Sequence, residues 1–175
     1  MKLFIGCSSK KEIDGSYLDM VSSISKRISN LGYDLVIGGN LPSGPMKTIV
    51  DEFRNNGRLV YINSLSKYDE ELVGNMECFD DTFTRNKENY NEADMILILP
   101  GGIGTLSELF SMLEEKRTRE DKKEFIIYNY NNFYMDIITL LARLNKDKFN
   151  DKNILESIRV FNTEDDLLNY LEEVL

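Results

Sequence analysis

Two charged residues and a glycine-rich turn are the parts of this sequence that could do chemistry. Arg85 is followed by fourteen residues and then by the run PGGIGTLSE, which begins at Pro100 and ends at Glu108. The chain contains no histidine, which excludes Ser-His-Asp and Cys-His catalysis and every histidine-containing metal site. Carboxylates and arginine must therefore carry any chemistry.

The glycine-rich turn predicts a phosphate-binding site. Three glycines lie within residues 101–104, after the apolar run MILIL and before a helical pattern that starts at Thr105. Glycines let the backbone approach a bulky anion, and a helix start directs free N–H groups toward it. The alternative is a tight strand-to-helix turn without a ligand, and the pattern alone does not decide between them. The spacing is neither GxGxxG nor GK[ST], which argues against dinucleotide binding and ATP hydrolysis.

Both charged residues also have purely structural interpretations. Residues 105–108 read TLSE, a capping-box pattern in which Glu108 would bond the Thr105 N–H, and spacing alone favours this interpretation. Position alone also favours Arg85 as a solvated helix charge, although arginine is suited to binding phosphate or carboxylate through two hydrogen bonds. Asp80 and Asp81 are predicted to be N-terminal helix charges.

Alternating strands and helices must position these residues. Apolar runs predict strands at residues 1–6, 34–39, 58–63, 95–99, 124–129 and 159–162. Helical spacing of apolar residues predicts helices at 18–31, 45–55, 83–93, 105–113, 133–144 and 167–174. Continuous apolar strands indicate a sheet covered on both faces, so we expect a doubly wound parallel α/β fold, Rossmann-like, in one domain over residues 1–175. Residues 64–81 are polar and poorly periodic and are predicted to form a long loop or lid.

Three loops rich in small residues follow predicted strands. In an open parallel sheet, ligands bind beyond the carboxyl ends of the strands, where such loops converge. The candidate binding residues in these loops are Ser8, Ser9, Gly38, Gly39, Gly44, Gly101, Gly102, Gly104 and Thr105.

Composition excludes several other classes of function. The net charge is −9, which opposes binding to nucleic acid or to an anionic membrane. Cys7 and Cys78 form no CxxC pair, so neither a metal site nor a disulfide framework is indicated, and a reducing cytoplasm fits best. The longest apolar run, MILIL, is too short to span a bilayer. We expect a soluble cytoplasmic protein.

The sequence resembles the LONELY GUY (LOG) family, cytokinin riboside 5′-monophosphate phosphoribohydrolases that are often mislabelled lysine decarboxylases. Arg85 and the run PGGIGTLSE match the family signature R-x14-PGGxGTxxE. The start FIGCSS is similar to the family's first turn ending in GSS, and IGGNLPSGPM resembles its GGGxxGLMG loop. The closing stretch NTEDDLLNYLEEVL resembles its last helix, so the resemblance covers essentially the whole chain.

The resemblance implies an activity and a site. It makes Arg85 and Glu108 the paired catalytic residues and the glycine-rich turn the phosphate site. The implied reaction hydrolyses the N-glycosidic bond of adenosine 5′-monophosphate or an N6-modified derivative, giving the free base and ribose 5-phosphate, without a cofactor. A homodimer is also implied, to which we expect exposed Tyr128, Tyr130 and Tyr134 to contribute.

The chain departs from the family around the arginine, which leaves rival functions open. Family members commonly carry Met-His-x-Arg-Lys there, whereas this chain has Phe83 and Asn86 in place of the histidine and lysine. A non-catalytic nucleotide-binding or sensing domain is one alternative, and a nucleoside deoxyribosyl transferase, which would need base exchange, is another. Lysine decarboxylation fits less well, because no lysine lies in a context that suggests a pyridoxal phosphate Schiff base.

Overall fold

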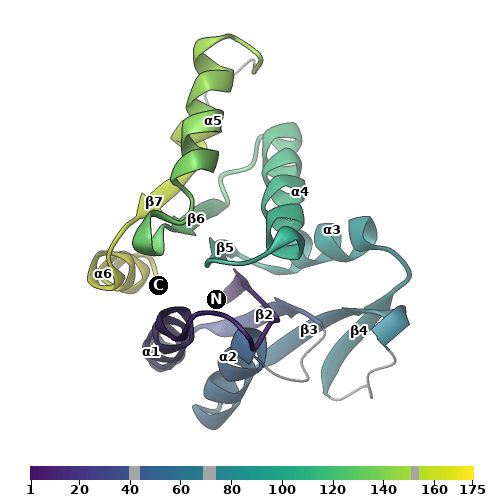
Figure 1. Ribbon diagram of the computed structural model, residues 1–175. Coiled ribbons are helices and arrows are strands. Elements are labelled where there is room, and N and C mark those ends of the chain that lie inside the picture. Colours follow the sequence, from purple (N-terminus) through teal and green to yellow (C-terminus); the bar gives the residue numbers. More distant parts are fainter. Residues whose placement is uncertain (40–43, 69–73, 151–153) are drawn as a thin grey trace.

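The chain folds around one parallel β-sheet. A computed structural model describes residues 1–39, 44–68, 74–150 and 154–175. In these residues the sheet has seven strands in the order β4-β3-β2-β1-β5-β6-β7, and every neighbouring pair is parallel (Figure 1). The strands are β1 (Lys2–Gly6), β2 (Asp34–Gly38), β3 (Val60–Leu65), β4 (Asn75–Phe79), β5 (Met95–Ile98), β6 (Glu124–Tyr128) and β7 (Arg159–Phe161).

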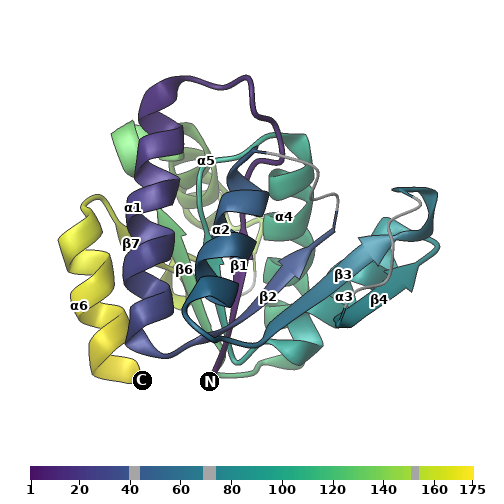
Figure 2. The ribbon, with the colours of Figure 1, turned by 90° about the horizontal axis from the view of Figure 1, so that it is seen from below.

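Helices cover both faces of this sheet. The α-helices are α1 (Gly15–Leu31), α2 (Gly44–Asn55), α3 (Thr82–Glu92), α4 (Ile103–Arg119), α5 (Met135–Lys146) and α6 (Glu164–Val174). Short 3-10 helices lie at η1 (Ser66–Tyr68), η2 (Tyr130–Asn132) and η3 (Ile154–Ser157). Helices α1, α2 and α6 pack on one face, whereas α3, α4 and α5 pack on the other (Figures 1 and 2).

The two hydrophobic clusters explain why the strands are continuous apolar runs. Leu3 and Ile5 of β1 belong to the cluster beneath α1, α2 and α6, while Phe4 between them belongs to the cluster beneath α3, α4 and α5. A strand buried on both faces needs an apolar side chain at every position. The predicted doubly wound parallel α/β fold is therefore confirmed.

Local sequence signals set several helix ends. The side chain of Asp14 accepts a hydrogen bond from the Ser16 N–H and caps α1, which ends at Gly32 with a φ of 118°. Asp81 accepts from the Thr84 N–H at 2.9 Å and caps α3, so its prediction as an N-terminal helix charge is confirmed. Pro45 lies in the first turn of α2, where its missing N–H has no helical partner to lose.

The prediction of a long loop at residues 64–81 is wrong. Strand β3 continues to Leu65, and β4 pairs with it along Asn75–Phe79. Residues 69–73 of this segment lie outside the described residues. Strand β4 pairs with a single neighbour and keeps most of its side chains in solvent, so it shows neither an apolar run nor an alternating pattern.

Two of the three tyrosines expected on the surface are buried. Tyr128 and Tyr134 belong to the hydrophobic core, and the Tyr134 hydroxyl donates a hydrogen bond to the Leu99 carbonyl at 2.8 Å. Their predicted role at a dimer surface is wrong, because a side chain that packs beneath the chain's own helices cannot contact a second copy. The exposed large apolar side chains include Phe83 and Ile103, each 84% exposed.

The sheet topology places three loops at one edge. From β1 the chain moves outward through β2 to β4 and then returns to β5 on the other side of β1. The carboxyl ends of β1 and β5 therefore form the switch point where ligands bind in such sheets. The two chain termini lie at the opposite edge (Figure 2). In the described part of the chain, no helix has the length and apolarity needed to cross a bilayer.

Candidate active site

A cavity of about 180 Å³ opens at the carboxyl edge of the sheet. Residues 7–10 after β1, Gly39 after β2 and residues 102–105 at the start of α4 contribute to its walls. Arg85 from the first turn of α3 and Glu108 from the second turn of α4 complete it. The loops after β1, β2 and β5 thus converge with the two charged residues, as the sequence predicted.

Arg85 and Glu108 form a buried ion pair. The Nη2 atom of Arg85 lies 3.0 Å from Oε1 of Glu108, and the two residues are 7% and 3% exposed. Arg85 is therefore not a solvated helix charge. Its Nη1 atom has no hydrogen-bond partner among the described residues and is available to a ligand in the cavity.

The carboxyl group of Glu108 titrates near neutrality. Burial raises its pKa to about 7, and the positive charge of Arg85 opposes this shift without cancelling it. Burial and the nearby Glu108 also raise the pKa of the Cys7 thiol well above its ordinary value, so this cysteine stays protonated. A carboxyl group with a pKa near 7 changes charge easily at physiological pH and suits catalysis.

Two strand-end glycines form the floor under this carboxyl group. A Cβ atom added at Gly38 would lie 2.9 Å from Oε1 of Glu108, and one at Gly6 would lie 3.3 Å from Oε2. The carboxyl group can approach the ends of β1 and β2 this closely because neither residue has a side chain. Glu108 is thus placed in line with the central strands.

The capping-box interpretation of Glu108 is wrong. Helix α4 starts at Ile103 after Gly102, so Thr105 lies inside its first turn and cannot be the N-cap. The Thr105 hydroxyl instead donates to the Cys7 carbonyl at 2.9 Å, and a Cβ at Gly101 would lie 2.2 Å from that hydroxyl. No described side chain caps α4, which leaves N–H groups of its first turn to face the cavity.

The remaining predicted binding residues lie around the cavity. Ser8, Ser9 and Gly104 line it, and a Cβ at Gly104 would meet no atom within 4 Å. Gly44 has a φ of +79° and lies against the backbone of Ser9, so it joins two of the loops. The predicted loop residues 40–43 lie outside the described residues.

Sequence reasoning missed three residues at the site. Lys10 is exposed but also lines the cavity, and Met46 of α2 lines it as well. Asn86 is 1% exposed and accepts hydrogen bonds from Arg85. The sequence showed Asn86 as a departure from the family motif but not as a partner of Arg85, because adjacent residues on a helix normally point away from each other.

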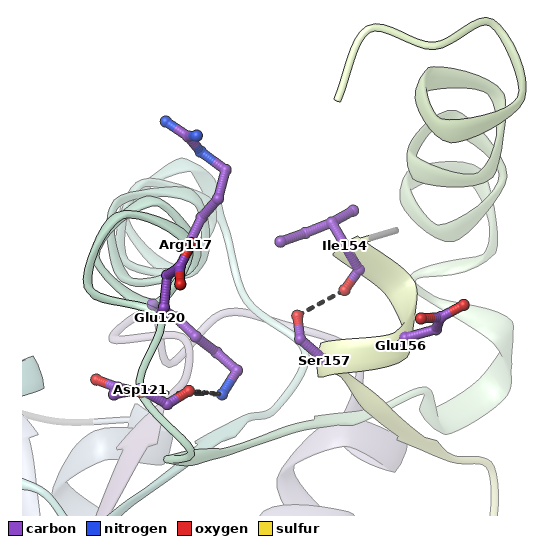
Figure 3. A pocket seen from close by; sticks show the side chains of 7 residues that line it. Arg117, Glu120, Asp121, Ile154, Glu156 and Ser157 are labelled. Carbon is purple, nitrogen blue, oxygen red and sulfur yellow. Dashed lines mark hydrogen bonds and ion pairs between the residues drawn. The ribbon is translucent and has the colours of Figure 1, made fainter. Parts of the chain in front are cut away.

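A wider cavity of about 510 Å³ lies near the opposite edge, between the end of α4 and η3 (Figure 3). The ammonium group of Lys116 donates to the Asp121 carbonyl and lies 3.9 Å from the Asp121 carboxylate, while Ser157 donates to the Ile154 carbonyl. These polar groups thus bond one another. Of these two cavities, the one at Glu108 is the better candidate, because it brings a buried charged pair next to the start of α4, which no described side chain caps.

Comparison with known proteins identifies the family of the chain. The family model described as "Possible lysine decarboxylase" matches residues 46–171. The chain is 25% identical over 177 residues to "Probable cytokinin riboside 5'-monophosphate phosphoribohydrolase LOGL6" of Oryza sativa subsp. japonica, covering 98% of this chain and 70% of that protein. It is also 25% identical over 178 residues to "Cytokinin riboside 5'-monophosphate phosphoribohydrolase LOG3" of Arabidopsis thaliana, covering 98% of this chain and 82% of that protein.

Solved structures share the fold. The molybdenum cofactor carrier protein of Chlamydomonas reinhardtii matches with a TM-score of 0.69 at 13% identity, over 99% of this chain and 98% of that one. The molybdenum cofactor binding protein of Rippkaea orientalis matches with a TM-score of 0.67 at 17% identity, over 99% and 98%. These similarities concern the fold alone. With the family match over most of the chain, the sequence motifs and the fold, the chain belongs to the LOG family, which the family model describes as possible lysine decarboxylases.

Proposed function

We propose that this protein hydrolyses the N-glycosidic bond of adenosine 5′-monophosphate or an N6-modified derivative, releasing the base and ribose 5-phosphate. The observation that carries this proposal is the buried carboxyl group of Glu108, held by Arg85 in a cavity at the uncapped start of α4. Relatives named as phosphoribohydrolases over nearly the whole chain support the same reaction.

The phosphate of the substrate would bind at the first turn of α4. The N–H groups of residues 103–105 and the positive end of the helix dipole favour an anion there, and Lys10 adds a positive charge to the same cavity. An uncharged nucleoside would gain nothing from these groups. We therefore expect the phosphate to be required for turnover.

Glu108 would act on the sugar. Cleavage of the N-glycosidic bond gives ribose an oxocarbenium character, which an ionised, buried carboxylate stabilises. Water adds to the sugar carbon, and a proton passes to the departing base, so the reaction balances without a cofactor. The free Nη1 of Arg85 would contact either the phosphate or the departing base.

Incubation with nucleotides tests the proposal directly. The purified protein should release free base and ribose 5-phosphate from AMP or N6-modified AMP, measured by chromatography without an acceptor base. Adenosine is the control, and kcat/KM for it should be lower by about 10² or more, because the phosphate contacts are lost. Comparable turnover of adenosine would contradict the assigned phosphate site, and release only in the presence of a second base would indicate a transferase.

A non-catalytic nucleotide-binding function is the second candidate. The observation that favours it is the changed motif, with Phe83 exposed and Asn86 bonded to Arg85 where the family commonly has histidine and lysine. Such a protein would bind AMP in calorimetry and release no base after prolonged incubation. Binding with release supports the hydrolase instead.

We also propose that the protein is a homodimer that uses the apolar side chains of Phe83 and Ile103. Both are 84% exposed at the starts of α3 and α4, two helices that pack against each other. Large apolar side chains exposed on neighbouring helices are typical of surfaces that bind another protein. Contact through this surface would also cover the mouth of the cavity, which Ile103 lines.

A further inference from the structure

The guanidinium group of Arg85 is held from two sides. Its Nε and Nη2 atoms donate to Oδ1 of Asn86 at 3.2 and 2.8 Å, and Nη2 also donates to Oε1 of Glu108 at 3.0 Å. Adjacent residues on a helix do not normally face each other, so the arginine side chain must curl back to reach Asn86. Its plane is fixed by these contacts.

Asn86 is itself held by α4. Its Nδ2 atom donates to the hydroxyl oxygen of Ser111 at 3.1 Å, and that hydroxyl donates to the Ser107 carbonyl at 2.5 Å. Arginine can only donate, so the amide oxygen must face Arg85 and the amide nitrogen must face Ser111. The hydrogen bonds thus run in one direction and connect Arg85 to the helix that carries Glu108.

These bonds limit how Arg85 pairs with Glu108. The amide oxygen of Asn86 occupies the Nε–Nη2 edge of the guanidinium, so Glu108 approaches the Nη1–Nη2 edge, where it accepts one hydrogen bond instead of the two parallel bonds typical of an arginine–carboxylate pair. One oxygen of Glu108 and the Nη1 atom of Arg85 are therefore left without partners among the described residues. These are the two groups that a substrate in the cavity would meet.

We propose that Asn86 is a positioning residue that holds Arg85 away from a two-bond pairing with Glu108 and aims its free nitrogen into the cavity. This inference rests on the proposed function for its kinetic consequence, but its effect on Glu108 does not depend on turnover. The other charged or titratable groups around Glu108 are Cys7, Tyr134 and Lys10, and substitutions at Asn86 leave all of them in place.

Two substitutions should move the titration of Glu108 in opposite directions. Asn86→Asp replaces the neutral amide that accepts hydrogen bonds from Arg85 with a carboxylate. This second negative charge near Glu108 should raise the pKa of Glu108 by about one unit or more. Asn86→Ala frees Arg85 to donate two bonds to Glu108, so that pKa should fall by a similar amount, about one unit. Asn91→Asp makes the same change at an exposed position of α3 and is the matched control.

The experiment measures the acid limb of kcat/KM against pH for AMP in the parent protein and the three variants. We expect the acid limb to shift to higher pH in Asn86→Asp and to lower pH in Asn86→Ala. In Asn91→Asp it should stay at the pH of the parent protein. A residue that only supports the fold would lower the melting temperature and leave the limb unmoved in all three, and this result would overturn the inference. So would shifts of the same direction in both Asn86 variants.

A second readout separates this inference from the proposed function. The pKa of Glu108 can be obtained from the pH dependence of stability, with Glu108→Gln in each background as the reference. If the protein does not hydrolyse AMP but these values still shift in opposite directions, the proposed function fails and the role of Asn86 stands. If Asn86→Asp does not fold, Asn86→Ala alone decides, because an unshifted or raised value in it contradicts the inference.

Discussion

Replacing Glu108 with glutamine should change how the stability of the protein depends on pH. The glutamine has nearly the same size and can still accept a hydrogen bond from Arg85, but it cannot ionise. Every other titratable group is common to the two proteins. The difference between their free energies of unfolding therefore isolates the titration of this one buried carboxyl group.

The size of the effect follows from the two pKa values. The pKa of Glu108 rises from 4.5, which is ordinary for a glutamate, to about 7 in the folded protein. Each pKa unit is worth about 1.4 kcal/mol, so the contribution of this group to the free energy of unfolding changes by about 3 kcal/mol. The folded state holds the proton more tightly, so the stabilising contribution is fully present below pH 4.5. This contribution is lost as the pH rises from 4.5 to about 7. Above about pH 7 the stability no longer changes through Glu108.

Denaturant unfolding at a fixed protein concentration, from pH 4.5 to 8, measures this difference. We expect the free energy of unfolding of the parent, minus that of Glu108→Gln, to fall by about 3 kcal/mol over that range. If attraction to Arg85 outweighed burial, the difference would rise with pH instead. A rising or flat difference would refute the argument that burial dominates at this site.

Four further predictions concern activity and assembly. The kcat/KM for AMP should rise about tenfold per pH unit and level off above about 7, since Glu108 must be ionised; a fall over this range would make it a general acid. Arg85→Ala should lower kcat/KM by about 10² or more, and Arg85→Lys should rescue only part of it; full activity of the lysine variant would show that charge alone suffices. Gly104→Ala should stabilise α4 by up to about 1 kcal/mol yet raise KM for AMP by about tenfold or more, because its methyl group enters the cavity; an unchanged KM would place the phosphate elsewhere. Replacing Phe83 and Ile103 together with serine should give a folded monomer by light scattering, and a persistent dimer would contradict the proposed surface.

Sequence patterns predicted the elements whose burial requires a run of apolar side chains. Strands β1, β2, β3, β5 and β6 were visible because both of their faces are covered, and the edge strand β7 was visible because Val160 and Phe161 are adjacent apolar residues. The other edge strand, β4, was missed because most of its side chains lie in solvent and demand no apolar pattern. The TLSE pattern suggested a cap at Thr105, but the helix had already started after Gly102, and local spacing cannot show that. The contact between Arg85 and Glu108 depends on how α3 and α4 pack, which only the fold reveals.

The glycines under Glu108 show that the family signature does not contain every residue on which the position of this glutamate depends. Gly6 and Gly38 lie outside the R-x14-PGGxGTxxE signature, yet a methyl group at Gly38 would lie 2.9 Å from the carboxyl oxygen that Arg85 holds. A natural variant with alanine there would keep the strand, the sheet and every residue of the signature, and its glutamate would still be displaced. Among distant relatives, a side chain at either strand end is therefore a better warning of a displaced glutamate than any change on the outer faces of α3 and α4.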